Sequence, residues 1–382
     1  MKALVKGTIL HRGEALKGMA LLFEETIRGV VPEPDLPEGC ERLDADGLMV
    51  SPGLIDLHIH GYAGEDTSDG SVEGIRRIAA GLLENGVTSF LPTTMTVSWP
   101  EIEQAFVAVR TLMPQSREAG FPGSEILGTH AEGPFINPRR KGAQAARDIL
   151  PPDAKRLLEH RDVVRIVTMA PEMPGGLAFI REVTSSSPIV VSIGHTDATF
   201  AQAMDAIAAG ASYVTHLFNA MSGLNHREPG VVGAALASPV YTELIADAFH
   251  VHPGLFALLA GTKGGRLVLV TDCTRAGGLG DGEYTLGGQP IFVKGIECRL
   301  EDGTIAGSVL RLNQAVRNLR DKAGLSDAQA VSHATQSAAG AIGVSDRKGS
   351  FEEGRDADIA LFDNEWNARA TYVRGTMKYR RA

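Results

Sequence analysis

The chain is 382 residues long and 43% of them are hydrophobic, enough to bury a barrel of roughly 250 residues with a smaller appendage. Its net charge of −9 and the lack of any basic tract beyond the short Arg139-Arg140-Lys141 argue against a nucleic-acid-binding protein, so an anionic substrate would need local basic residues. Its three cysteines, Cys40, Cys273 and Cys298, are odd in number and widely spaced, which argues against a disulfide framework.

The first 51 residues contain short β-like runs, at 3–10, 19–23 and 26–31, with glycine and proline between them and no long helical period. The sequence passes from Met1-Lys2-Ala3 directly into the first run. It contains no long apolar leader and no uninterrupted apolar stretch that would cross a bilayer. We therefore expect a cytoplasmic protein with no membrane partner and no nucleic-acid partner.

From residue 52 onward, short apolar runs alternate with helix-like segments, the pattern of repeated βα units. The predicted strands cover residues 54–60, 87–93, 126–132, 164–170, 189–195, 213–217, 243–247 and 267–272. The predicted helices between them cover residues 72–85, 100–113, 152–160, 176–183, 200–209 and 253–261. Eight strands with helical crossovers predict an α/β fold, a (β/α)8 TIM-like barrel whose active site lies at the carboxyl ends of the strands.

Two segments lie outside this pattern after the eighth strand. The glycine-rich segment 277–307 is interpreted as a β-hairpin excursion that forms one wall of the pocket. Residues 348–382 resemble the first 51, with β-like runs at 357–363 and 370–373. We therefore expect residues 1–51 and 348–382 to pair into one small β-sandwich domain, and residues 52–347 to form the barrel.

Two histidines stand at the end of the first predicted barrel strand. Because side chains in a strand alternate between its faces, Asp56, His58 and His60 share one face. A helix would place the two histidines far apart around its axis, and the flanking Gly53 and Gly61 are more typical of a strand. Both imidazoles are therefore predicted to point into one cavity.

Further side chains that suit a metal end the third, fifth, sixth and eighth predicted strands: Glu132, His195, His216 and Asp272. Imidazole and carboxylate are the ligands of catalytic divalent-metal sites, which keep a position open for water. A lone histidine is more often a core or surface residue, but a convergent set indicates a metal-dependent hydrolase. Asp272 is the expected general base toward water and general acid toward a departing amine.

Several motifs resemble the amidohydrolase superfamily. The run from Pro52 to Gly61 and the closing Gly354-Arg355-Asp356-Ala357-Asp358 are similar to the superfamily as a whole. A narrower resemblance, to its deacetylases of phosphorylated N-acetyl amino sugars, runs nearly end to end. It rests on Glu132-Gly133-Pro134-Phe135, Gly194-His195-Thr196-Asp197-Ala198, Asn219-Ala220-Met221, Arg227-Glu228-Pro229-Gly230 and Val270-Thr271-Asp272.

The resemblance implies roles for individual residues. The implied metal ligands are Glu132, His195, His216, His58 and His60, of which the last two are replaced by amides in some members. The implied substrate contacts are Ala143, Gln144, Asn219, Ala220, Arg227, His250, Ala306 and Gly307. Several relatives carry histidine where this chain has Gln144. The implied cofactor is one or two divalent ions per subunit, Zn²⁺ first and Fe²⁺ as an alternative.

The resemblance also implies an activity and a partner. The activity is hydrolysis of N-acetyl-D-glucosamine 6-phosphate to D-glucosamine 6-phosphate and acetate. The partner is a second copy of the chain, whose Arg227 reaches the phosphate in the neighbouring pocket with two parallel hydrogen bonds. An exposed Arg227 paired with Glu228 is the alternative. His130 is expected to orient the metal ligands from behind.

Three other functions stay open at this point. One is deacetylation of the galactosamine epimer, since pocket contacts decide the orientation of one hydroxyl. Another is a cyclic-amide hydrolase, a type that commonly bridges its metals with a carboxylated lysine where this chain offers Glu132. The last is a non-catalytic scaffold, which would be expected to have lost ligands that this chain retains.

Overall fold

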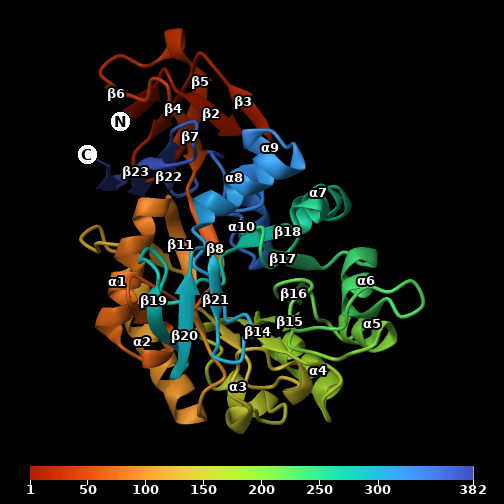
Figure 1. Cartoon of the computed structure of the whole chain (residues 1–382). Helices are drawn as coiled ribbons and strands as arrows, with labels where there is room; N and C mark the ends of the chain where they lie inside the picture. Colours follow the sequence, from red (N-terminus) through yellow and green to blue (C-terminus); the bar gives the residue numbers. More distant parts are fainter. Residues whose placement is uncertain (382) are drawn as a thin grey trace.

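A computed structural model, which describes residues 1–381, contains the predicted barrel at its centre (Figure 1). The parallel barrel strands are, in hydrogen-bonded order, β8 (Leu54–Ile59), β11 (Val87–Thr94), β13 (Thr129–Glu132), β14 (Val164–Met169), β15 (Val190–Ile193), β16 (Tyr213–Val214), β17 (Tyr241–Ile245) and β18 (Leu267–Val270). The last strand meets the first where the Asp272 N–H donates to the His58 carbonyl at 2.8 Å. The predicted (β/α)8 fold is therefore confirmed.

The predicted third strand is broken in two. A short β12 (Glu125–Ile126) pairs with the first half of β11, and β13 pairs with its end. Gly128 lies between them with φ of +139°, a backbone conformation that L side chains rarely adopt. The break is local, and the chain stays in the barrel wall.

Helices cover the outside of the barrel. They are α1 (Val72–Leu82), α2 (Trp99–Gln115), α3 (Ala154–Leu158), α4 (Gly176–Ser186), α5 (Phe200–Ala208), α6 (Gly230–Ala237), α7 (Phe256–Lys263), α8 (Leu312–Ala323), α9 (Asp327–Ser332) and α10 (Gln336–Ala341). Side chains mark several starts, as where Ser71 accepts from Gly74 N–H at 3.0 Å. The sequence did not reveal α6, because its residues are apolar or glycine all round and show no polar stripe.

The two ends of the chain form two further sheets. One has the order β5 (Ile27–Pro32), β4 (Met19–Phe23), β1 (Lys2–Val5), β6 (Glu41–Asp44). The other has the order β24 (Thr376–Arg380), β23 (Ala368–Val373), β22 (Ile359–Phe362), β7 (Met49–Pro52), β2 (Thr8–His11), β3 (Glu14–Leu16). Phe23, Val50 and Leu361 belong to one apolar cluster between them. The predicted run 3–10 is split between the sheets at Lys6, whose φ is +63°.

Two of the places where the β-sandwich meets the barrel lie close to the barrel strands. Only Gly53 separates β7 of the sandwich from β8 of the barrel, and a Cβ there would lie 2.1 Å from Thr88 Oγ1. The second place is a charge cluster, here called the Lys348 cluster, in which Glu125, Lys348 and Asp358 are buried and Arg347 and Asp356 are half-buried. Lys348 Nζ lies 2.6 Å from both Glu125 Oε2 and Asp358 Oδ2.

The excursion after β18 is a three-stranded antiparallel sheet, larger than the predicted hairpin. Its strands are β19 (Gly282–Leu286), β20 (Gln289–Lys294) and β21 (Glu297–Arg299), and it lies in front of the barrel in Figure 1. A short β-ribbon, β9 (Gly61–Tyr62) with β10 (Glu65–Asp66), follows β8. Among the described residues, no helix combines the length and the apolar character needed to cross a membrane.

Candidate active site

Six of the predicted site residues converge at the carboxyl ends of the barrel strands. They form two groups whose possible ligand atoms lie within 4.8 Å of one another: Glu132, His195 and His216, and then His58, His60 and Asp272. Together they are called the metal-site cluster. Glu132 joins the groups, because its Oε1 is 3.0 Å from His216 Nε2 and its Oε2 is 3.3 Å from His60 Nε2.

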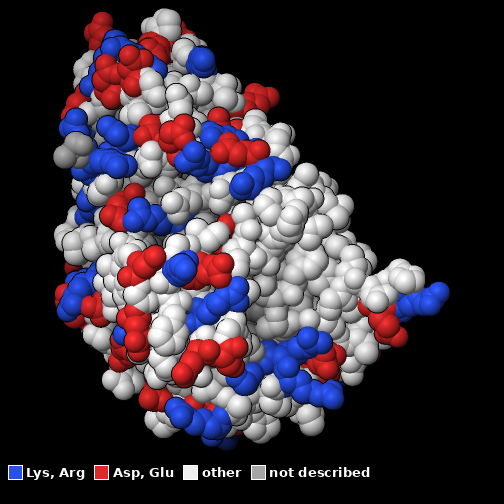
Figure 2. Space-filling model, viewed as in Figure 1, with Lys and Arg blue, Asp and Glu red and all other residues white. Residues whose placement is uncertain are grey.

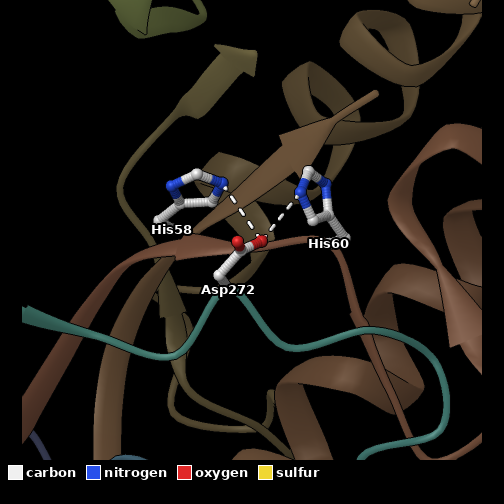
Figure 3. Close-up of side chains that lie close together, drawn as sticks. All are labelled: His58, His60 and Asp272. Carbon is white, nitrogen blue, oxygen red and sulfur yellow. Dashed lines mark ion pairs between the residues drawn. The ribbon is translucent and has the colours of Figure 1, made fainter. Parts of the chain in front are cut away.

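The first-strand histidines flank Asp272, as Figure 3 shows. Asp272 Oδ1 lies 3.5 Å from His58 Nε2 and 3.1 Å from His60 Nε2. The histidines come from β8 and the residue after it, and Asp272 comes from the loop after β18. These two segments are hydrogen-bonded neighbours, so barrel closure itself brings the three side chains together.

The ring nitrogens are arranged to present lone pairs to a cation. Nδ1 of His195 lies 2.9 Å from the Arg140 carbonyl, and Nδ1 of His60 lies 3.2 Å from the Thr93 carbonyl. Because a carbonyl only accepts, Nδ1 carries the hydrogen in both rings, and the neutral ring keeps its lone pair on Nε2. Both Nε2 atoms face Glu132. The residues present therefore fit a divalent metal ion.

Glu243 holds this arrangement from behind, and the sequence reasoning did not single it out. Its buried Oε2 accepts from His58 Nδ1 at 2.9 Å and from the His216 N–H at 2.8 Å. A carboxylate inside the apolar run of the seventh strand was the available signal, because such a group needs a buried partner. Glu243 thus turns His58 Nε2 toward Asp272.

His130 lies behind the cluster and does not face the cavity. Its Nδ1 donates to the Leu57 carbonyl at 3.0 Å, and its Nε2 accepts from Thr168 Oγ1 at 2.7 Å. Burial, and then the nearby His58, lower the pKa of His130 to about 3. The ring is therefore neutral, and both its nitrogens have protein partners.

The electrostatics of the cluster favour a bound cation. Burial opposes the charge on His60, but the carboxylates of Asp272 and Glu132 outweigh burial and raise the pKa of this histidine to about 10. Burial likewise opposes the charge on Asp272, but His58 and His60 lower its pKa to about 2. The carboxylates therefore stay ionised at neutral pH, and they attract either protons or a metal ion to the facing nitrogens.

Three residues of the cluster have left-handed backbone, with φ of +47° at His195, +30° at His216 and +50° at Asp272. Each lies two residues after the last residue of its barrel strand. A non-glycine residue in this region costs about 1–3 kcal/mol and persists only where the surrounding structure imposes it. The strand ends thus turn these side chains inward against the local preference of the backbone.

The cluster opens into a cavity of about 400 Å³. Of the expected substrate contacts, those that line it are Ala143, Gln144, Asn219, Ala220, His250 and Gly307. Ala306 is buried beside the cavity, and Arg227 is exposed and does not line it. The rim also carries Arg139 and Arg140, which the sequence had shown only as a short basic run. Arg140 is held by Asp197 at 2.7 Å.

Comparisons with known proteins agree with this geometry. Residues 49–378 match the model of the amidohydrolase family. The chain is 42% identical to an N-acetylglucosamine-6-phosphate deacetylase of Bacillus subtilis, over 88% of this chain and 85% of the relative. It is 35% identical to an N-acetylgalactosamine-6-phosphate deacetylase of Escherichia coli O157:H7, over 87% of this chain and 89% of the relative.

A solved structure is similar over nearly the whole chain. It is an N-acetyl-D-glucosamine-6-phosphate deacetylase mutant from Mycobacterium smegmatis in complex with N-acetyl-D-glucosamine-6-phosphate. Its TM-score is 0.90 and its sequence identity 31%, and 99% of each chain is covered. With the barrel, its buried histidine and carboxylate groups and these matches in agreement, the chain belongs to the amidohydrolase family and is a homologue of N-acetylglucosamine-6-phosphate deacetylases.

Proposed function

We propose that the chain hydrolyses the acetamide of N-acetyl-D-glucosamine 6-phosphate, giving D-glucosamine 6-phosphate and acetate. The observation that carries this proposal is the Asp272 carboxylate, which faces the histidines of the metal-site cluster in a cavity of about 400 Å³. The relative bound to this sugar phosphate supports the choice of substrate.

Glu132, His195 and His216 are proposed to hold one divalent ion, and His58, His60 and Asp272 are the residues that would hold a second, so one or two ions are proposed per subunit. Zn²⁺ suits a set of imidazoles and carboxylates, with Fe²⁺ as the alternative. When bound, such an ion supplies a water whose pKa is lowered to about 7 and polarises the amide carbonyl.

Asp272 is the proposed catalytic residue. Its carboxylate accepts a proton from the attacking water as the new C–O bond forms at the acetyl carbon. It returns that proton to the amide nitrogen as the C–N bond breaks, so acetate and the free amine leave. Its lowered pKa keeps the carboxylate ionised before the reaction, which is the state that a base requires.

Other residues of the cavity wall are proposed to bind the sugar phosphate. His250 Nδ1 lies 2.6 Å from Asp247 Oδ2, which fixes the ring and leaves Nε2 for the substrate. Asn219 and the backbone of Ala220 are the proposed phosphate contacts within the chain. Arg139 and Arg140 add positive charge at the rim of an otherwise acidic protein.

We further propose a homodimer in which Arg227 completes the neighbouring pocket. Residues 229–262 contain only two charged side chains, Glu243 and Asp247, and both are buried. Figure 2 accordingly shows a broad uncharged face over α6 and α7, where Leu224 and Leu258 are exposed. In the described part of the chain, no ion pair joins Arg227 to Glu228. The arginine is therefore available to a phosphate in the partner.

An acetate-release assay tests the activity. The metal-loaded protein is offered N-acetylglucosamine 6-phosphate, N-acetylgalactosamine 6-phosphate and both unphosphorylated sugars. We expect the highest kcat/KM on the glucosamine compound and little activity without phosphate. Preference for the galactosamine epimer would select the second candidate, which the relative from E. coli O157:H7 favours. If neither phosphorylated sugar releases acetate, the proposal is refuted.

Mixing variants tests the shared pocket. Arg227→Ala should raise KM for the phosphorylated sugar, and Arg227→Lys should recover only part, because an ammonium lacks the planar fork. Heterodimers of Arg227→Ala and Asp272→Asn chains carry both lesions in one pocket and none in the other. Activity should reappear on exchange of subunits. No recovery would mean that Arg227 serves its own chain.

A further inference from the structure

Gln144 lies in the cavity wall next to the metal-site cluster, and its side chain is almost fully buried. Its own N–H donates to the Lys141 carbonyl at 2.9 Å, which fixes its backbone. The side-chain amide has two protein partners. Oε1 accepts from the Thr96 N–H at 2.6 Å, and Nε2 donates to Glu132 Oε2.

The two partners determine which way the amide faces. A backbone N–H only donates, and an ionised carboxylate only accepts. If the amide of Gln144 were reversed, its nitrogen would face the Thr96 N–H and its oxygen would face the Glu132 carboxylate. Only one orientation satisfies both contacts, so the N–H groups of Gln144 must point at Glu132.

This contact divides the two oxygens of Glu132 between different tasks. Oε1 lies 3.3 Å from His58 Nε2, 3.2 Å from His195 Nε2 and 3.0 Å from His216 Nε2. Oε2 takes the hydrogen bond from Gln144 and lies 3.3 Å from His60 Nε2. Rotation of the carboxylate would lose the Gln144 bond and turn Oε1 away from the three imidazoles.

Thr96 anchors both members of this pair. Its N–H holds Gln144, and its Oγ1 donates to the Glu132 carbonyl at 3.2 Å. Thr96 lies so close to this backbone that a Cβ on Gly133, the residue after Glu132, would be 2.1 Å from Thr96 Oγ1. Thr96 therefore holds Glu132 in two ways, directly through the Glu132 carbonyl and indirectly through Gln144.

We propose that Gln144 is a positioning residue for Glu132. Its hydrogen bond keeps Oε1 of Glu132 directed at the facing imidazoles, where the divalent ion would be held. The inference deepens the proposed function and rests on its metal site, but not on the identity of the sugar. Groups that orient a metal ligand typically change metal affinity by about 10–100-fold when they are removed. A substrate contact would instead change KM and leave metal affinity alone.

The test measures Zn²⁺ affinity directly. Apo forms of the wild type, Gln144→Met and Gln144→Asn are titrated with Zn²⁺ against a chromogenic chelator. Met is similar in length but makes no hydrogen bond, and Asn is one methylene too short to reach both partners. Gln289→Met is the matched control, because Gln289 Nε2 donates to the neighbouring Ala143 carbonyl at 2.6 Å and not to Glu132.

We expect the Zn²⁺ dissociation constant to rise about 10–100-fold in both Gln144 variants and to stay unchanged in the control. Wild-type Zn²⁺ affinity in the variants, or an equal loss in Gln289→Met, would overturn the inference. Should the wild type release no acetate while Gln144→Met still weakens Zn²⁺ binding, the proposed function fails and this inference stands.

Discussion

The protein buries two clusters of charge, and they differ in where their positive charge comes from. In the Lys348 cluster, Glu125 and Asp358 face the permanent cation of Lys348, at 2.6 Å each. In the metal-site cluster, Glu132 and Asp272 face only histidines, whose rings become positive only by taking up a proton. The first cluster is electrostatically complete, and the second attracts a cation from outside.

This difference separates a structural task from a chemical one. A buried carboxylate is costly unless it is paired, so each cluster needs compensation. A lysine that belongs to the chain supplies it permanently and joins the sandwich to the barrel. A set of lone pairs accepts an exchangeable ion, which can also bind water and substrate. If the two clusters differ in this way, variants of the metal-site cluster should lose activity and variants of the Lys348 cluster should lose stability.

Removal of a ligand should have the largest effect. Glu132→Gln and His195→Ala should each lose the metal and with it the activity, since each takes away one of three facing ligand atoms. Elemental analysis and acetate release measure both, and added divalent metal should restore only part. Full metal content together with full rate in either variant would show that the metal-site cluster is assigned wrongly.

Asp272→Asn should act on the reaction and leave the protein folded. The amide is nearly isosteric but cannot accept a proton, and general acid-base assistance is typically worth about 10²–10⁴ in rate. The metal held by Glu132, His195 and His216 should remain. We compare kcat of the variant and the wild type at saturating metal, and thermal unfolding of both proteins checks that the variant is folded. A variant with more than about a tenth of the wild-type turnover would contradict the role of Asp272 as base.

Lys348→Met should change stability and not chemistry. The substitution leaves the buried Asp358 without a cation and Glu125 with Arg347 but without its lysine, and breaking a buried pair from one side typically costs about 3–5 kcal/mol. Urea unfolding measures the loss. Lys6→Met is the control, because Lys6 makes a similarly short ion pair with Asp44, at 2.7 Å, in an exposed position. Equal stability of the two variants would show that the Lys348 cluster does not depend on its buried lysine.

The smallest expected effect is on the pH dependence of stability. Burial raises the pKa of Glu125, but Lys348 and Arg347 outweigh it and bring the pKa below its ordinary value of 4.5. Unfolded Glu125 therefore takes up a proton at higher pH than the folded form, and the stability it contributes is lost as the pH falls below 4.5. Asp358 limits this loss, because burial raises its pKa.

The advantage of the wild type over Lys348→Met should therefore shrink as the pH falls through 4.5. Unfolding of both proteins across this range measures the difference, and effects of the metal-site cluster cancel because both proteins contain it. A difference that grows as the pH falls would contradict the sign of the Glu125 shift.

The local sequence pattern was sufficient to predict most of the barrel strands. It was not sufficient to predict contacts between segments that are distant in the sequence. The strands were predictable because each is a short apolar run, whereas α6 has no polar stripe and Gly128 breaks the third strand through its backbone alone. The spacing of His58 and His60 in a strand was enough to predict that both rings point into one cavity. Glu243 did not, because its role depends on a neighbour 185 positions away.

The single residue between β7 and β8 has a consequence for how the molecule comes apart. Because Gly53 is the only residue between β7 and β8, the sandwich cannot swing or be cut away without disturbing the first barrel strand. The same strand carries His58 and leads directly to His60. Loosening of the sandwich would therefore reach the active site at once, and heating should melt both bodies in one cooperative calorimetric transition.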